Sequence, residues 1–204
     1  MSLKKLFCGL VAVTFLCSSC GTARANAPDA SAAVKEEFRY ELGEIGGLST
    51  LMALSWLDAA KAKGAKAVHL KIHSPGGSVF AGLALMQKVE ALGIPVHCTV
   101  DAAAFSMAFV LLQSCTTRAM TKRSMLMMHT SSANGEMSGG EEDYRNAAEF
   151  LRVINRSMVE HCAARMGMDP DKLEAMISGG KELWLDHRQA LKLGAVDTVV
   201  PSVP

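Results

Sequence analysis

The sequence predicts an α/β fold of one domain with a largely parallel sheet. Segments of strand length alternate along the chain with longer segments of helical spacing, and this alternation is typical of parallel strands joined by helices. A glycine turn follows one apolar strand directly, at the place where parallel sheets hold their active sites. The chain has 204 residues, 50% of them hydrophobic, which suffices for one sizeable core.

The first half of the chain is predicted to form three strands separated by two helices. Apolar runs mark the strands, helical spacing of apolar residues marks the helices, and Gly43, Gly64 and Gly93 end three of the elements. In chain order the elements are a strand over 38–42, a helix over 48–63, a strand over 67–72, a helix over 79–92 and a strand over 95–100.

The second half is predicted to be richer in helix. Small residues over 101–104 are typical of a turn, the Ser/Gly-rich stretch 131–140 is typical of a loop, and Gly167 and Gly194 end two helices. In chain order the elements are a helix over 105–113, strands over 117–120 and 125–129, a long amphipathic helix over 141–166, a short helix that Asp169 caps and Pro170 begins, and a last helix over 186–193 that opens on a capping box.

The N-terminus predicts an export signal. Lys4 and Lys5 form a short basic start, and residues 6–16 form an apolar run too short to span a bilayer. We therefore expect a signal peptide over 1–25 ahead of a single domain over 34–200. The mature protein is expected outside the cytoplasm, in the periplasm or anchored to a membrane facing it.

Two processing sites compete within this signal. Small residues before Cys20 resemble a lipobox, in which Cys20 would carry a lipid, although Cys17 stands where Leu is preferred. Ala23-Arg24-Ala25 offers instead an A-x-A site for ordinary signal peptidase, which would leave Asn26 as the new N-terminus. Both interpretations stay open.

Charge and cysteine content exclude several classes of function. The net charge of +1 and the scattered basic residues argue against binding of nucleic acid. No pair of cysteines has C-x-x-C spacing, so we expect no metal site, and no cofactor motif is present. Cys98 and Cys115 flank the segment that contains Ser106; they form either a disulfide, if the compartment is oxidising, or two buried free thiols.

Three motifs supply what acyl transfer requires: oxyanion donors, a nucleophile and a base. Gly76 and Gly77 lie between a strand and a helix, where backbone amides can approach a ligand closely. Ser106 begins an apolar helix, and His129 ends an apolar strand, from which it can act as a general base. Taken singly, each has a structural explanation: a turn glycine, a helix cap and a strand-end histidine.

Together, in this order, the motifs resemble the proteolytic subunit family of the Clp protease, and the resemblance covers most of the chain after the signal. The family patterns N-S-P-G-G, A-A-S-M-G, V-M-I-H-Q and E-R-D-x-F-L-S-A correspond to residues 73–77, 104–108, 126–130 and 180–187. The resemblance implies a ClpP/crotonase-like fold of repeated β-β-α units with a long handle helix, here over 141–166.

The resemblance also implies roles for single residues. Ser106 corresponds to the nucleophile, His129 to its base, and the backbone amides of Gly77 and Met107 to the oxyanion hole. The family's catalytic Asp is replaced by Glu182, whose longer side chain can still orient the imidazole. Asp186 is the alternative acid, although its capping-box position suggests a structural task.

Further departures and alternatives accompany these assignments. Phe105 stands where the family usually has a small residue, and it narrows a cleft or adds to the core. With Glu182, it keeps open a scaffold or binding protein that retains the fold without the activity. A crotonase-type acyl-thioester enzyme is less favoured, because coenzyme A is scarce outside the cytoplasm. A serine–lysine pair would require Lys122 or Lys181 in the cleft.

We therefore expect a serine endopeptidase that cleaves peptides or unfolded proteins through a Ser-His-acid triad. The family implies homo-oligomeric rings, in which the helix over 141–166 packs between rings. Little room is left before the first strand for the loop that engages an ATP-driven unfoldase, and ATP is not expected outside the cytoplasm. No unfoldase partner is expected, and membrane contact only through a lipid on Cys20.

Overall fold

The structure is a computed structural model that describes residues 34–35, 38–133 and 139–201. The signal peptide over 1–25, its Cys20 and most of the second half of the loop after His129 lie outside the described residues, so the predicted division into signal and domain stays a prediction. The elements are β1 (Arg39–Leu42), α1 (Gly47–Ala62), β2 (Val68–Ser74), α2 (Val79–Ala91), β3 (Val96–Phe105), α3 (Met107–Gln113), β4 (Thr117–Thr121), β5 (Met125–Met128), α4 (Glu141–Met166), α5 (Pro170–Ile177), β6 (Leu183–Leu185), α6 (His187–Lys192) and β7 (Thr198–Val200).

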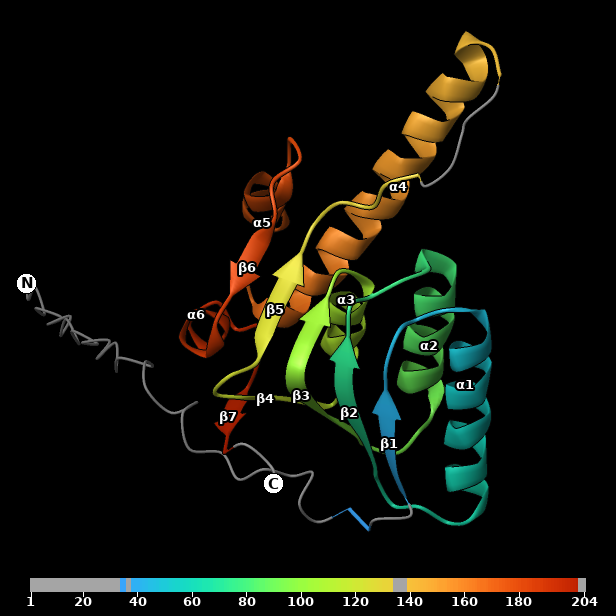
Figure 1. Cartoon of the computed structure of the whole chain (residues 1–204), viewed down its shortest axis with the longest axis vertical. Coiled ribbons are helices and arrows are strands. Elements are labelled where there is room, and N and C mark those ends of the chain that lie inside the picture. The colour runs from blue at the N-terminus through green and yellow to red at the C-terminus, as the bar shows by residue number, and fades with distance from the viewer. Residues whose placement is uncertain (1–33, 36–37, 134–138, 202–204) are drawn as a thin grey trace, which may run out of the picture.

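The predicted α/β fold with a parallel sheet is confirmed (Figure 1). Seven strands form one sheet, in which β1, β2, β3, β4 and β7 follow one another as parallel neighbours. β5 runs parallel to β3, and β6 is antiparallel to β5. Helices α1, α2, α3 and α4 contact one another in succession. No helix of the described chain combines the length and apolar character needed to cross a membrane.

Strand β3 changes its neighbour halfway along its length. Its first half pairs with β4, and its second half, Ala103 to Phe105, pairs with β5. At the change Ala102 adopts a positive φ of 83°, and the Ser124 hydroxyl accepts from its amide at 3.0 Å. The prediction of a turn over 101–104 is therefore wrong, because pairing with β5 makes these small residues part of β3. Helix α3 accordingly starts at Met107 rather than at Phe105.

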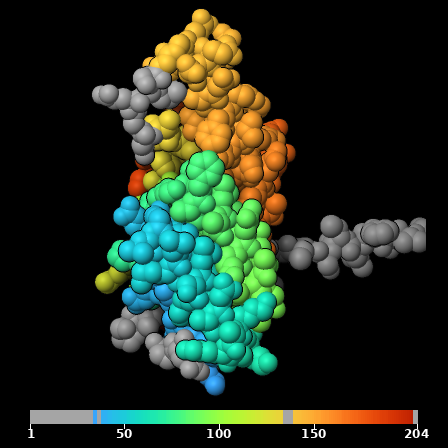
Figure 2. Space-filling model, turned by 90° about the vertical axis from the view of Figure 1, so that its right-hand side faces the viewer, coloured from blue at the N-terminus to red at the C-terminus, as the bar shows by residue number. Residues whose placement is uncertain are grey.

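Helix α4 has two halves with different surroundings. Its N-terminal half contains no buried residue and forms exposed ion pairs along its surface, such as Arg145 with Glu141. Its buried residues all lie in the C-terminal half, and they are Met158, Val159, Cys162, Ala163 and Met166. Figure 2 shows the start of α4 at the top of the molecule, and Phe150 of this half stacks on Phe80 of α2 with ring centroids 6.0 Å apart. The bounds predicted for this helix are those observed, because an amphipathic pattern and Gly167 in a left-handed conformation define it locally.

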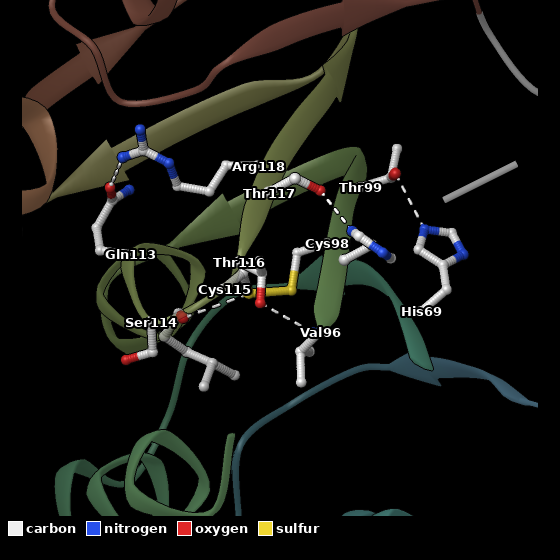
Figure 3. Close-up of a disulfide and its surroundings, with 12 residues drawn as sticks. His69, Val96, Cys98, Thr99, Gln113, Ser114, Cys115, Thr116, Thr117 and Arg118 are labelled. Carbon is white, nitrogen blue, oxygen red and sulfur yellow. Dashed lines mark hydrogen bonds between the residues drawn. A yellow bond between two sulfur atoms is a disulfide. The ribbon is translucent and has the colours of Figure 1, made fainter. Parts of the chain in front are cut away.

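A disulfide joins Cys98 on β3 to Cys115, which lies between α3 and β4 in the chain (Figure 3). Their Cα atoms are 6.0 Å apart and both residues are buried. The pairing of His97 with Thr117 on the neighbouring strand brings the two cysteines together. Of the two interpretations of these residues, the structure has the disulfide, and Cys162 is buried as a free thiol.

A buried arginine ties the C-terminus to the centre of the fold. Arg118 on β4 donates to both carboxylate oxygens of Asp197, from Nη2 at 2.6 Å and from Nε at 3.2 Å. Its Nη1 donates to Gln113 Oε1 at 2.5 Å, as drawn in Figure 3, and to the Arg165 carbonyl at 3.1 Å. One guanidinium therefore connects α3, β4, α4 and the segment that leads into β7.

This ion pair makes stability depend on pH. Burial alone would raise the pKa of Asp197, but the hydrogen bonds and the positive charge of Arg118 outweigh burial and hold it below its ordinary value. Because the pKa is lower in the folded state, the stabilisation is complete above the unfolded pKa of about 4 and is lost as the pH falls through the folded pKa.

Replacing Asp197 by Asn should lower the free energy of unfolding near neutral pH by about 2 kcal/mol, because the charged acceptor of Arg118 is lost. Urea unfolding of both proteins at about pH 7 and about pH 3 measures the difference, which should shrink at the lower pH. A difference that stays the same at both pH values would contradict this account of the ion pair.

Candidate active site

Ser106 lies on a sharp turn between β3 and α3. Its φ of 53° and ψ of −121° are unusual for a residue other than glycine, and such strain is typical of functional sites. The turn is held by the Ser106 amide, which donates to the Met127 carbonyl on β5 at 2.8 Å. The half-buried side chain therefore stands at the carboxyl end of β3 and at the N-terminus of an apolar helix.

His129 follows β5 directly and faces Ser106. The parallel pairing of Phe105 with Met127 places the residues just beyond each strand end side by side. His129 Nε2 and Ser106 Oγ are 2.7 Å apart, which is a short hydrogen bond between a base and a hydroxyl. This distance is the one that a nucleophile and its general base require.

The glycine turn after β2 lies against the Ser106 turn. A Cβ on Gly76 would stand 2.6 Å from the Phe105 carbonyl and 2.8 Å from Ser106 Cβ, so only glycine fits there. The neighbouring Gly77 has a φ of 140° and is bridged to Ile45 through the bonds of Gly76 and Ser78.

Two backbone amides are left available at this place. The Ile45 bridge uses the Gly76 carbonyl and the Ser78 amide, so the Gly77 amide takes no part in it. Met107 is the first residue of α3, where an N–H has no helical acceptor. Its side chain packs on Gly82 of α2, where any Cβ would stand 2.2 Å from Met107 Cγ. The glycine turn lies against this helix start, since a Cβ on Gly76 would stand 3.0 Å from the Met107 nitrogen. Backbone amides of this kind can donate to an oxyanion.

The close contact at Gly77 predicts that any side chain at this position lowers the stability of the folded protein. A Cβ would lie 2.0 Å from the Ile45 carbonyl oxygen, so Gly77→Ala should lower the free energy of unfolding by about 2 kcal/mol through strain at this turn. Gly64→Ala is the matched control, since Gly64 also has a positive φ but nothing within 4 Å of the added Cβ. Equal losses in urea unfolding of the two variants would contradict the contact argument.

The structure does not bring a carboxylate to His129 among the described residues. Glu182 Oε2 accepts instead from the Trp184 indole N–H at 3.0 Å, and Glu182 is exposed. Asp186 caps α6, where its Oδ1 accepts from the amides of Arg188 and Gln189. The Gln189 amide, followed by the Arg188 amide, outweighs burial and lowers the pKa of Asp186. Neither acid forms an ion pair with the imidazole in the part of the chain that the structure describes.

Sequence reasoning missed one residue of the site. Trp184 contacts Phe105 edge to face, with ring centroids 5.1 Å apart, and also holds Glu182. The aromatic position two residues after the acid of the family pattern was the signal that could have found it.

The alternative of a serine–lysine pair is not observed in the described part of the chain. Within these residues no cluster of three or more His, Cys, Asp or Glu could hold a metal ion. Lys122 lies in the turn before β5 and Lys181 precedes β6, and the described hydrogen bonds connect neither of them to Ser106. The base beside Ser106 is His129.

Comparison with known proteins points to one family. Residues 48–203 match the family model described as Clp protease. The chain is 28% identical over 139 residues to ATP-dependent Clp protease proteolytic subunit 2 of Thermobifida fusca (strain YX), covering 67% of this chain and 66% of that protein. It is 35% identical over 135 residues to proteolytic subunit 3 of Rhodococcus jostii (strain RHA1), covering 65% of each. The chain thus spans about two thirds of the length of these relatives.

Proposed function

Because the chain belongs to the Clp protease family, we propose that it is a serine endopeptidase acting on peptides or unfolded proteins. The observation that carries the proposal is the 2.7 Å contact between Ser106 Oγ and His129 Nε2. The proposal assigns the oxyanion hole to the amides of Gly77 and Met107, because the first takes no part in the Ile45 bridge and the second has no helical acceptor.

The reaction follows from these positions. Ser106 Oγ attacks the scissile carbonyl while His129 takes its proton, and the amides of Gly77 and Met107 donate to the oxygen that becomes negative. His129 then returns the proton to the leaving amine, and a water attacks the acyl-enzyme with His129 again as base. Glu182 is the acid that would orient the imidazole, after a change of side-chain orientation.

We further propose that the protein is exported and works without an ATP-driven unfoldase. The Cys98–Cys115 disulfide supports this location, because disulfides persist outside the reducing cytoplasm. Assembly into homo-oligomeric rings is proposed from the family and from three exposed apolar side chains on α1, which are Leu48, Leu51 and Met52.

A catalytically impaired scaffold is the second candidate. The observation that favours it is the engagement of Glu182 by Trp184 rather than by His129. The two candidates differ in one property, because a scaffold binds unfolded chains but does not cleave them.

Incubation of the purified protein with unfolded casein and with short fluorogenic peptides, with no nucleotide and no other protein, tests the proposal. We expect cleavage of both substrates, and none by the Ser106→Ala variant. Cleavage of casein only after addition of an ATP-driven unfoldase would contradict independent action. Binding of casein with no cleavage of either substrate would favour the scaffold.

A further inference from the structure

The register of β5 and β6, extended by one pair, would set Glu182 opposite His129. β5 and β6 pair Leu126 with Leu185, Met127 with Trp184 and Met128 with Leu183. The next pair in the same register is His129 with Glu182, one position beyond the last bonded pair. Opposed residues of antiparallel strands have side chains on the same face, with Cβ atoms about 4.5–5.5 Å apart. In this register the backbone positions would bring the Glu182 side chain within reach of the His129 imidazole.

The side chain of Glu182 is nevertheless held elsewhere. The Trp184 indole N–H donates to its Oε2 at 3.0 Å, and residues two apart on a strand share a face. In this orientation neither carboxylate oxygen pairs with His129. A charge-assisted bond of this kind competes with the imidazole for the carboxylate.

The indole is itself fixed by the residue beside the nucleophile. The Phe105 and Trp184 rings meet edge to face at 5.1 Å, and Phe105 pairs with Met127, which also pairs with Trp184 across β5. Such ring contacts add stabilisation beyond their buried area. The contact with Phe105 thus positions the indole that donates to Glu182, although 45% of Trp184 is exposed.

We propose that Trp184 is a positioning residue that holds the Glu182 carboxylate away from His129 and thereby slows acylation of Ser106. This role rests on the proposed peptidase function. When the indole bond breaks, Glu182 turns to the imidazole and stabilises the cation that forms during the reaction. Removal of the indole N–H alone, with the ring retained, should therefore speed the reaction.

The test measures the rate at which a fluorophosphonate labels Ser106 in the full chain, over a range of probe concentrations. Four variants are compared with the unchanged protein: Trp184→Phe, Glu182→Gln, the two combined, and Trp56→Phe as a matched control. Trp56 lies on α1 and makes a tilted ring contact with Tyr40. Trp184→Phe should raise the maximal labelling rate about fivefold, the equivalent of one modest hydrogen bond. The probe concentration for half-maximal rate should stay unchanged.

Dependence on Glu182 separates positioning from a general effect on packing. Trp184→Phe should give no gain in the Glu182→Gln background, because no carboxylate is left there to turn to His129. A change in packing against Phe105 occurs in both backgrounds and would give the same gain in each. A rate equal to or below that of the unchanged protein, or an equal gain in both backgrounds, would overturn the role of Trp184 alone. No labelling of Ser106 in any variant would overturn the proposed function, and this role with it.

Discussion

Replacing Ser106 or His129 by alanine should lower kcat for peptide hydrolysis by about 10⁴-fold or more, the range found when a nucleophile or its base is removed from a serine hydrolase. The reason is the single 2.7 Å contact, because without the base the Ser106 hydroxyl is a weak nucleophile, and without the hydroxyl no acyl-enzyme forms. Steady-state hydrolysis of a fluorogenic peptide measures both variants.

The two losses should not add. Residues that act as a unit give a double variant about as slow as either single variant, and the Ser106→Ala/His129→Ala protein tests this. His187→Ala is the matched control and should keep the normal kcat, since His187 is the first residue of α6 and no described hydrogen bond joins it to Ser106. A His129→Ala protein with more than a tenth of the normal kcat would contradict its assignment as general base.

Removing the disulfide should lower the free energy of unfolding by about 3 kcal/mol, the loop-closure value for a loop of roughly this length. The bond links residues separated by 17 positions, and Ser106 lies within the loop that it closes. The Cys98→Ala/Cys115→Ala protein should therefore unfold at lower urea concentration and lose peptidase activity at a lower temperature.

The free cysteine supplies the control for this experiment. Cys162 is buried, and burial raises the pKa of its thiol above its ordinary value, so it should resist alkylation in the folded protein. Among the three cysteines that the structure describes, alkylation after unfolding without reductant should mark Cys162 alone, and added reductant should expose Cys98 and Cys115. Cys162→Ala leaves the loop intact, so equal urea midpoints for the double variant and the unchanged protein would contradict the disulfide argument.

Local patterns predicted those parts of the fold that local residues decide. The helix over 141–166 and the capping box at Asp186 are observed because each depends on neighbours in the sequence. β6 and β7 were missed, since three residues carry no periodicity and only their partners define them. The turn predicted over 101–104 was wrong for the same reason, because β5 decides that stretch from another part of the chain.

The candidate site divides in a similar way. The motifs around Gly77, Ser106 and His129 could be read from the sequence because they stand in a recognisable order. The engagement of Glu182 by Trp184 could not, since it depends on the β5–β6 register and on side-chain orientation. The disulfide stayed open because spacing alone does not place Cys98 and Cys115 on adjoining elements, whereas the β3–β4 register does.

The most direct measurement is the identification by mass spectrometry of the residue that a fluorophosphonate modifies. Ser106 Oγ attacks the phosphorus of the probe, so that a P–O bond forms, the P–F bond breaks and fluoride leaves, while His129 takes the hydroxyl proton. Modification therefore requires both members of the pair. We predict one adduct, on Ser106, that is absent from the His129→Ala protein. A folded protein that stays unmodified, or an adduct on another serine, would contradict the assignment of Ser106 as the nucleophile of a serine peptidase.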